Sequence, residues 1–131
     1  MSDSADRFTS APVSQLIGFH VQPGGVGEAS VELDCGIRHH NPMDRVHGGV
    51  IAALADAAMG IAFGRTLLDK EDFSTIEMKV NFIRPVKVGR IVANAEVIER
   101  GLRVGFVECV VTNDRGKRVA TASCTCTIIN G

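Results

Sequence analysis

The sequence predicts an α+β fold in which one long central helix packs on an antiparallel sheet of five to six strands. Two observations lead to this prediction. Apolar and polar residues alternate along most of the second half of the chain, which is typical of half-buried strands. Residues 48–64, in contrast, are apolar on almost every side at helical spacing, which indicates a buried helix.

Domain organisation follows from length and composition. The chain has 131 residues, 45% of them hydrophobic, which suffices for one domain with a substantial core. Residues 1–12 are mainly polar and lack the apolar core of a signal peptide, so we expect a flexible tail followed by a single domain over residues 13–131. A short helix should open this domain, with Ser10 as its N-cap, Leu16 and Ile17 together on its packed side and Gly18 at its end.

One strand and the long helix come next. Every second residue from Ala29 to Cys35 is apolar, which predicts a strand with one buried face. A polar segment with the turn signal Asn41-Pro42 then leads to the helix, which should begin near His47 and end around Gly64.

Four further strands should form a meander after the helix. The first covers residues 74–82, with an apolar face that begins at Ile76 and leaves Thr75 on the opposite face. The last three are separated by tight turns at residues 99–101 and 113–116, which favour antiparallel pairing.

Charge and cysteine content exclude several classes of protein. The formal net charge is -1, so the chain offers no broad basic surface to a nucleic acid or an anionic membrane. The four cysteines form no CxxC pair, and we expect reduced, mostly buried thiols in a cytoplasmic protein. The longest apolar run is marginal in length for a membrane span and has an acid at its centre, which predicts a soluble protein.

That acid, Asp56, is the one charged residue of the long helix. The residues three and four positions away are Ala52, Ala53, Met59 and Gly60, so no opposite charge is within reach along the helix. A desolvated carboxylate is unfavourable, so either polar groups elsewhere bind it or its pKa rises. The first case makes Asp56 a structural residue, and the second suits a general base.

The start of the same helix offers hydrogen-bond donors. His47-Gly48-Gly49 stands where the first N–H groups have no partner within the helix, and glycine allows another atom to approach that backbone closely. The helix dipole adds about half a positive charge there. Such a terminus can stabilise a carbonyl oxygen that gains negative charge, although an ordinary helix start with closely packed glycines is the alternative.

The spacing of these residues forms a longer pattern. Asn41 is followed by five residues, then by His47-Gly48-Gly49, and Asp56 stands nine positions after the histidine. This pattern resembles the motif of hot-dog-fold acyl-CoA thioesterases of the PaaI and THEM2 type. Downstream, STIEMKVNFIRPVKVG resembles the family's next strand, with Thr75 at its Ser/Thr position. The resemblance runs from about residue 16 to residue 128.

The resemblance implies two subunits that pair their sheets and share a site at their interface. Asp56 would act as general base on a water, or as nucleophile, toward the thioester carbonyl, with Thr75 of the same subunit placing the water or the carboxylate. From the other subunit, Gly48 N–H would polarise the carbonyl, His47 would hydrogen-bond near the thioester and Asn41 would hold the water. The resemblance thus implies an acyl-CoA thioesterase. Its smallest functional unit would be a homodimer, and two dimers would form a homotetramer. It needs no cofactor, because CoA is part of the substrate.

Candidate substrate contacts fall into two groups. Apolar residues near the helix would meet the acyl group, and basic residues around Pro85 or beyond the helix would meet the CoA phosphates, although each is also explained as an ordinary core or surface residue. The first group contains Gly49, Val50, Met59, Phe63 and Phe82, and the second contains Arg84, Lys87, Arg90, Arg65 and Lys70.

Three other functions fit part of the pattern. His39, His40, Asp44 and His47 could form a metal site, although adjacent histidines diverge in an extended segment. A hydratase or dehydratase of the same fold would also use a histidine and a carboxylate. A noncatalytic acyl-CoA-binding or sensor domain would keep the cleft without turnover, although such a binder has little use for Asp56 beside an apolar ligand.

Overall fold

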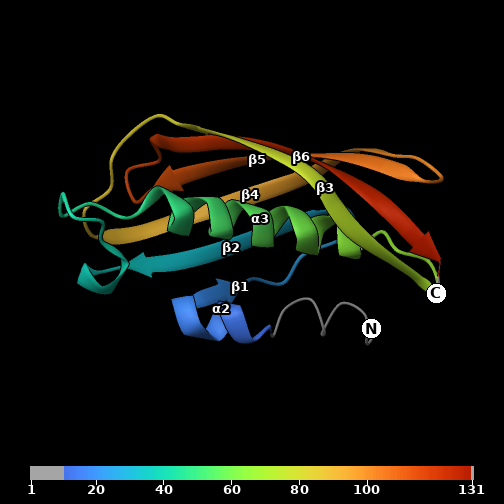
Figure 1. The fold of residues 1–131 in the computed structure, drawn as a ribbon, viewed down its shortest axis with the longest axis horizontal. Coiled ribbons are helices and arrows are strands. Elements are labelled where there is room, and N and C mark those ends of the chain that lie inside the picture. The colour runs from blue at the N-terminus through green and yellow to red at the C-terminus, as the bar shows by residue number, and fades with distance from the viewer. Residues whose placement is uncertain (1–10, 131) are drawn as a thin grey trace.

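One antiparallel sheet curls around a long helix in the computed structural model, which describes residues 11–130 (Figure 1). The elements in chain order are α2 (Pro12–Ile17), β1 (Phe19–Val21), β2 (Glu28–Cys35), η1 (Ile37–His39), α3 (Gly48–Gly64), β3 (Glu71–Phe82), β4 (Gly89–Arg100), β5 (Val104–Asn113) and β6 (Arg118–Asn130). The six strands follow the order β1-β2-β4-β5-β6-β3, and all neighbours are antiparallel. The predicted fold class is therefore confirmed.

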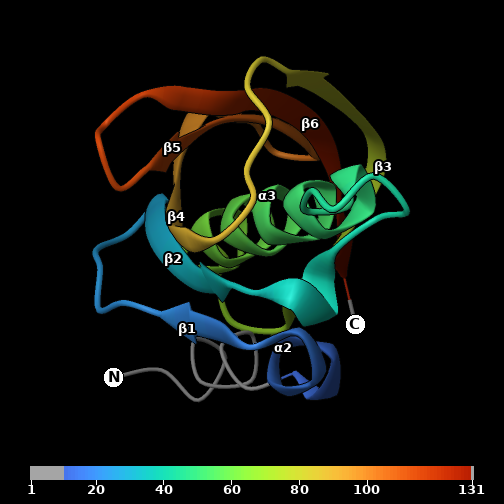
Figure 2. The same ribbon diagram turned by 90° about the vertical axis from the view of Figure 1, so that its left-hand side faces the viewer.

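The helix α3 lies on the concave side of the sheet, as the second view shows (Figure 2). It packs mainly against β2, β4 and β5. On β5, Gly105 leaves room for the ring of Phe63, since a Cβ atom at this position would overlap that ring. No helix within residues 11–130 is both long and apolar enough to cross a membrane.

Most predicted elements are confirmed, but the expected meander of four strands after the helix is wrong for its first strand. β3 pairs with β6, and only β4, β5 and β6 follow one another in the sheet, because β4 pairs with β2 on its other side. The strand β1 was not expected, because its three residues are too few for an alternating pattern.

Residues 1–10, which form most of the expected tail and include Ser10, lie outside the described residues. The N-cap of α2 is Ala11, whose side chain makes no capping hydrogen bond. The expected packing of Leu16 is wrong, because Ser14 and Ile17 share the covered side of α2 and leave Leu16 exposed.

The strand β3 contains a β-bulge that sequence alternation did not predict. Its register against β6 shifts between Thr75 and Glu77, so Ile76 is the extra residue. Thr75 therefore shares a face with Met78, and Ile76 is exposed. The predicted faces of Thr75 and Ile76 are reversed, because alternation holds only while each residue has one partner on the neighbouring strand.

The two edges of the sheet differ in length. At one edge β1 has three residues, and at the other β3 has 12. Among residues 11–130, no strand lies beside the outer edge of β3 between residues 74 and 82. A long unpaired edge of this kind is a template for pairing with another strand.

Candidate active site

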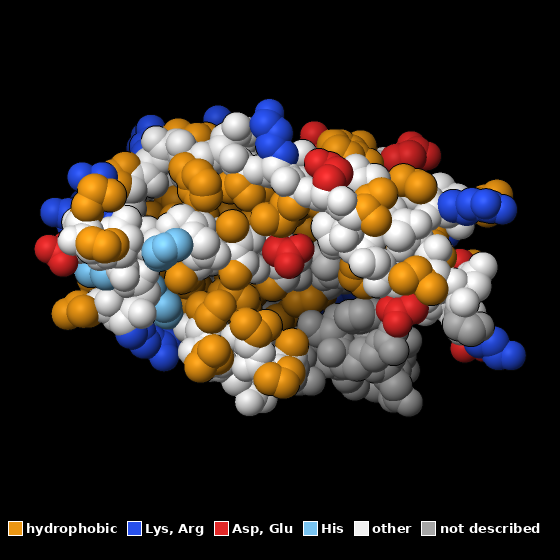
Figure 3. Space-filling view, in the orientation of Figure 1, with side chains coloured by type: hydrophobic (Ala, Val, Ile, Leu, Met, Phe, Trp, Pro, Cys, Tyr) orange, Lys and Arg blue, Asp and Glu red, His pale blue; other side chains and the backbone are white. Residues whose placement is uncertain are grey.

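Asp56 lies in a groove between α3, α2 and the first half of β3. Figure 3 shows a largely hydrophobic surface over α3. Asp56 is the one acidic residue of this helix. The groove has a volume of about 290 Å³. Its wall contains Ala53, Ala57, Gly60 and Ile61 of α3, Val13 and Ser14 of α2, Ala11, Phe19 and Phe73.

The Asp56 carboxylate reaches solvent through this groove but has apolar neighbours. No hydrogen bond or ion pair joins it to another group among residues 11–130. Desolvation by the surrounding side chains raises its pKa above the ordinary value. The structure therefore favours the second of the two sequence-based interpretations, a carboxylate without a structural partner.

At the start of α3, one backbone N–H is left free. His47 is the N-cap, and its Nδ1 accepts a hydrogen bond from the Gly49 N–H at 2.8 Å. The Val50 N–H donates to the His47 carbonyl at 2.9 Å. Within the described part of the chain, the Gly48 N–H has no acceptor. Of the two glycines, Gly48 is therefore the available donor, and since Nδ1 accepts, the ring proton of His47 stands on Nε2.

Asn41 organises the loop that precedes α3. Its Oδ1 accepts from the Met43 N–H at 2.9 Å and from the Arg45 N–H at 3.3 Å. Asp44, inside this loop, has a positive φ of 61°. The side-chain oxygen of Asn41 is thus already used by the backbone, and its amide NH₂ group is the part that remains for a ligand.

Thr75 lies on the inner face of β3 next to two buried thiols. Its Oγ1 is 3.9 Å from Cys126 Sγ, which is 3.8 Å from Cys124 Sγ. The hydrogen bond with Cys126, burial, and the nearby charges of Cys126 and Asp56 raise the pKa of Cys124. Thr75 and the two thiols therefore lie on the same inner side of the sheet, which is the position that the bulge gives to Thr75.

Asp56 and the free N–H of Gly48 are too far apart to act on one carbonyl group. They stand eight positions apart on the same helix, which corresponds to about 12 Å along its axis. Each chain therefore carries two separate half-sites, one with the carboxylate and one with the helix N-terminus.

The apolar candidates divide into core and surface residues. Met59 and Phe63 have no exposed surface, so the structure places them behind the groove and not in its wall. Val50 is half-buried, while the exposed ring of Phe82 lies near the helix start, 3.3 Å from where a Cβ atom would stand on Gly48. Phe73 was not among the residues identified from the sequence, although it lines the groove. It stands two positions before Thr75 on β3, so a strand with Thr75 on its inner face also has Phe73 there.

Two of the basic candidates, Arg90 and Arg65, each bind two other residues. Arg90 donates to both carboxylate oxygens of Asp34, at 2.8 and 3.2 Å, and pairs with Glu32 at 3.1 Å. Arg65 donates to the backbone carbonyls of Glu28 and Gln22. The other three, Arg84, Lys87 and Lys70, are exposed.

The histidines of the proposed metal site are engaged separately. His39 contacts the Ile17 carbonyl through Nε2 and the Gly36 N–H through Nδ1. His40 Nε2 contacts the Lys87 carbonyl. No group of three or more potential ligands from His, Cys, Asp and Glu occurs in residues 11–130.

This chain matches the model of one protein family, and its structure matches solved structures of the same fold. The model of the "Thioesterase superfamily" matches residues 43–120. A 1,4-dihydroxy-2-naphthoyl-CoA hydrolase of Listeria monocytogenes is 26% identical over 113 residues, which cover 86% of this chain and 92% of that protein. The medium/long-chain acyl-CoA thioesterase YigI of Escherichia coli is 29% identical over 93 residues, which cover 61% of this chain and 60% of that protein.

Among solved structures, the PaaI protein from the phenylacetic acid degradation operon of E. coli matches with a TM-score of 0.90 and 22% identity, covering 99% of this chain and 96% of that chain. At this identity the similarity concerns the fold alone. The hot-dog fold expected from the sequence resemblance is therefore confirmed.

Proposed function

Because the chain belongs to the thioesterase superfamily, we propose that it hydrolyses the thioester of an acyl- or aryl-acyl-CoA to the free acid and CoA. The observation that carries the proposal is the Asp56 carboxylate, which has no partner within residues 11–130 and stands in an apolar groove. Its raised pKa brings its proton affinity closer to that of a general base at neutral pH. The groove beside it suits the hydrocarbon part of an acyl group.

A second copy of the chain completes the site in this proposal. The outer edge of β3 from residue 74 to residue 82, which has no neighbouring strand within residues 11–130, would pair with the same stretch of the other copy, so that the sheets of the two subunits become continuous. Gly48 of one subunit would then approach Asp56 of the other, which the distance along one helix does not allow within a chain. A homodimer is the smallest active unit, and a dimer of dimers is the larger assembly that we expect.

The chemistry needs few groups. Asp56 takes a proton from water, and the hydroxide attacks the thioester carbonyl; alternatively, a carboxylate oxygen of Asp56 attacks and the resulting anhydride is hydrolysed. The Gly48 N–H stabilises the oxyanion, and the thiolate of CoA leaves without a strong acid. A positioned base contributes about 10²- to 10⁴-fold and one oxyanion donor about 10²- to 10³-fold. Thr75, His47 Nε2–H and the Asn41 amide would position the water and the thioester.

The cell compartment is part of the proposal. All four cysteines are free and buried. Unpaired thiols are usual where the redox potential keeps them reduced, so we assign the activity to the cytosol.

The first test measures hydrolysis of phenylacetyl-, benzoyl-, hexanoyl-, lauroyl- and palmitoyl-CoA through loss of thioester absorbance. We expect turnover by the wild type and a loss in kcat of at least about a hundredfold in Asp56→Asn. The matched control is Asp69→Asn, an exposed carboxyl outside the groove. A wild-type protein that binds these thioesters without hydrolysing any would overturn the proposal in favour of a binding or sensor domain.

The second test isolates the Gly48 N–H. Proline is accepted at the first position of a helix, and His47 already has the extended backbone that precedes proline (φ -60°, ψ 134°). Gly48→Pro removes the N–H, while Gly48→Ala adds a Cβ atom and keeps it. We expect a loss in kcat of about a hundredfold in the proline variant only.

Mixing the two inactive variants tests the shared site. A mixed dimer of Asp56→Asn and Gly48→Pro subunits retains one intact site, built from the unchanged Asp56 of one and the unchanged Gly48 of the other. Random mixing should therefore restore about a quarter of wild-type activity. No restoration in confirmed mixed dimers would overturn the assignment of the two half-sites to different subunits.

A further inference from the structure

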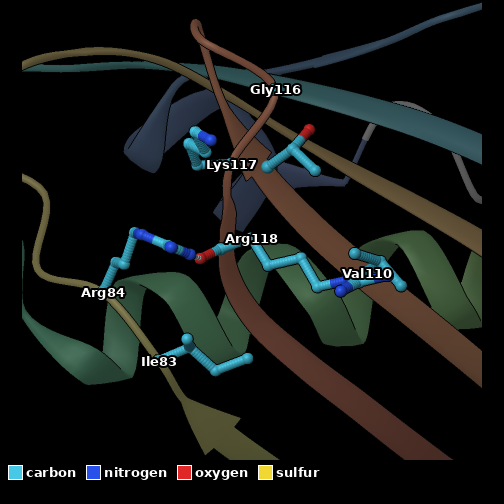
Figure 4. A pocket seen from close by; sticks show the side chains of 7 residues that line it. Ile83, Arg84, Val110, Gly116, Lys117 and Arg118 are labelled. Carbon is cyan, nitrogen blue, oxygen red and sulfur yellow. Dashed lines mark hydrogen bonds between the residues drawn. The ribbon is translucent and has the colours of Figure 1, made fainter.

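A second cavity lies on the outer face of the sheet, close to the end where α3 begins. Its volume is about 630 Å³. On β5, Val110 and Thr112 alternate with the buried Cys109 and Val111, so they point away from α3. The other lining residues come from the segment after β3 and from the β5–β6 hairpin, and they are Ile83, Arg84, Gly116, Lys117 and Arg118 (Figure 4).

Three cations surround this cavity, and none of its lining residues is acidic. Arg84 Nη1 donates to the Arg118 carbonyl at 2.8 Å, which fixes the Arg84 side chain beside the start of β6. Figure 4 shows the Arg118 side chain extending toward Val110. Among residues 11–130, no carboxylate pairs with Arg84, Lys117 or Arg118. Cations gathered without a counter-charge favour an anion with several oxygens, such as a phosphate group.

The cavity also has an apolar part. The side chains of Ile83 and Val110 are 49% and 36% exposed, and they stand beside the cations. A flat ring can pack on such side chains while its phosphates contact the guanidinium and ammonium groups. This combination fits a phosphorylated nucleoside better than a free inorganic anion.

The cavity connects with the start of α3 through a short stretch of chain. The Phe82 ring stands against Gly48, and Ile83 and Arg84 follow it directly. The N–H groups of Ile83 and Arg84 both donate to the Val119 carbonyl, at 2.8 and 3.1 Å, which fixes this stretch at the start of β6. A thioester held at Gly48 would therefore place the rest of an extended CoA molecule within reach of the cavity.

We propose that Arg84, Lys117 and Arg118 bind the adenosine 3′,5′-bisphosphate end of the CoA thioester, with the adenine against Ile83 and Val110. This assignment rests on the proposed function, and of its three cations only Arg84 was among the candidates identified from the sequence. Lys117 and Arg118 recognise the substrate without touching the reacting atoms.

The test uses the full chain and the double variant Lys117→Ala/Arg118→Ala. We expect its KM for an acyl-CoA to rise about tenfold, with kcat within about twofold of the wild type, because charge-assisted contacts to phosphate are lost. The KM for the same acyl group on pantetheine, which lacks the nucleotide, should be the same in both proteins. The matched control is Arg115→Ala, an exposed cation of the same hairpin that does not line the cavity.

Calorimetry with adenosine 3′,5′-bisphosphate provides a readout that needs no turnover. Binding by the wild type and its loss in the double variant support the proposal, even if no thioester is hydrolysed and the proposed function fails. An equal rise in KM for the CoA and pantetheine thioesters would overturn it, and so would binding of inorganic pyrophosphate as tight as that of the nucleotide. If the wild type turns over acyl-CoA and the double variant keeps its KM, this site is wrong while the thioesterase proposal stands.

Discussion

The two long sides of α3 differ in how completely the rest of the chain covers them. Toward the concave sheet, Leu54 and Phe63 have no exposed surface. On the opposite side, Ala53 and Gly60 are only partly covered, and Asp56 reaches solvent in the groove. The same helix thus has a closed side, which holds the fold together, and a groove side, which residues 11–130 cover only in part. One almost entirely apolar helix can therefore pack into the core on one side and line a groove on the other.

The strongest contrast is expected between two glycines beside phenylalanine rings. On the closed side, Gly105→Ala would press a methyl group into the buried Phe63 ring, and we expect a loss of about 2 to 3 kcal/mol in the free energy of unfolding. On the groove side, a Cβ atom at Gly60 would stand an ordinary 3.7 Å from the Phe73 ring. Gly60→Ala should be neutral or stabilising by up to about 1 kcal/mol, since alanine favours the helix. Urea unfolding of both variants measures the contrast, and equal losses would contradict it.

A smaller effect is expected on substrate choice. Gly60→Leu would fill part of the groove without entering the closed core, so kcat/KM for lauroyl-CoA should fall about tenfold relative to acetyl-CoA. The Gly60→Ala variant provides the control for the helix itself. Steady-state kinetics with the two thioesters decides the question. If both substrates lose activity equally, the groove does not hold the acyl group.

The smallest effect concerns stability against pH. Burial raises the pKa of Asp56 in the folded state above its unfolded value, so ionisation of this group costs stability. The cost is absent below the unfolded pKa and appears as the pH rises through the folded pKa. We therefore expect Asp56→Asn to have a slightly higher Tm than the wild type at pH 7, with the difference fading below about pH 4.

Thermal unfolding of both proteins at the two pH values checks this expectation. Asp69→Asn, at an exposed position, should show no such trend. A wild type more stable than Asp56→Asn at pH 7 would mean that the carboxylate has a stabilising partner, and the groove side would then be less incomplete than described.

Sequence patterns predicted the elements well where a single segment carries the signal. The boundaries of α3 follow from His47 as cap and from the apolar run, and the alternation of β6 gives the buried face that includes Cys124 and Cys126. The bulge at Ile76 could not be predicted in this way, because it is a property of the pairing between β3 and β6. The inner face of Thr75 therefore could not be predicted from alternation, and only the family resemblance suggested a role for this residue.

The candidate site shows the same limit. Asp56 and Gly48 were identified because their chemistry contrasts with their neighbours along the chain. The groove wall was not, since Val13, Phe19 and Phe73 come from three separate elements that only the fold brings together. For the same reason, Lys117 and Arg118 join Arg84 only after the sheet has formed.

The small residues of the groove wall have a consequence for how such a protein can evolve. Ala53, Ala57 and Gly60 shape the space next to Asp56 but leave the closed side of α3 unchanged. Under the proposed function, single substitutions at these positions would alter which acyl group fits, at little risk to folding. In this architecture, the residues that would set substrate selectivity and those that stabilise the core stand at different positions of one helix. A change of substrate would then require no compensating substitution in the core.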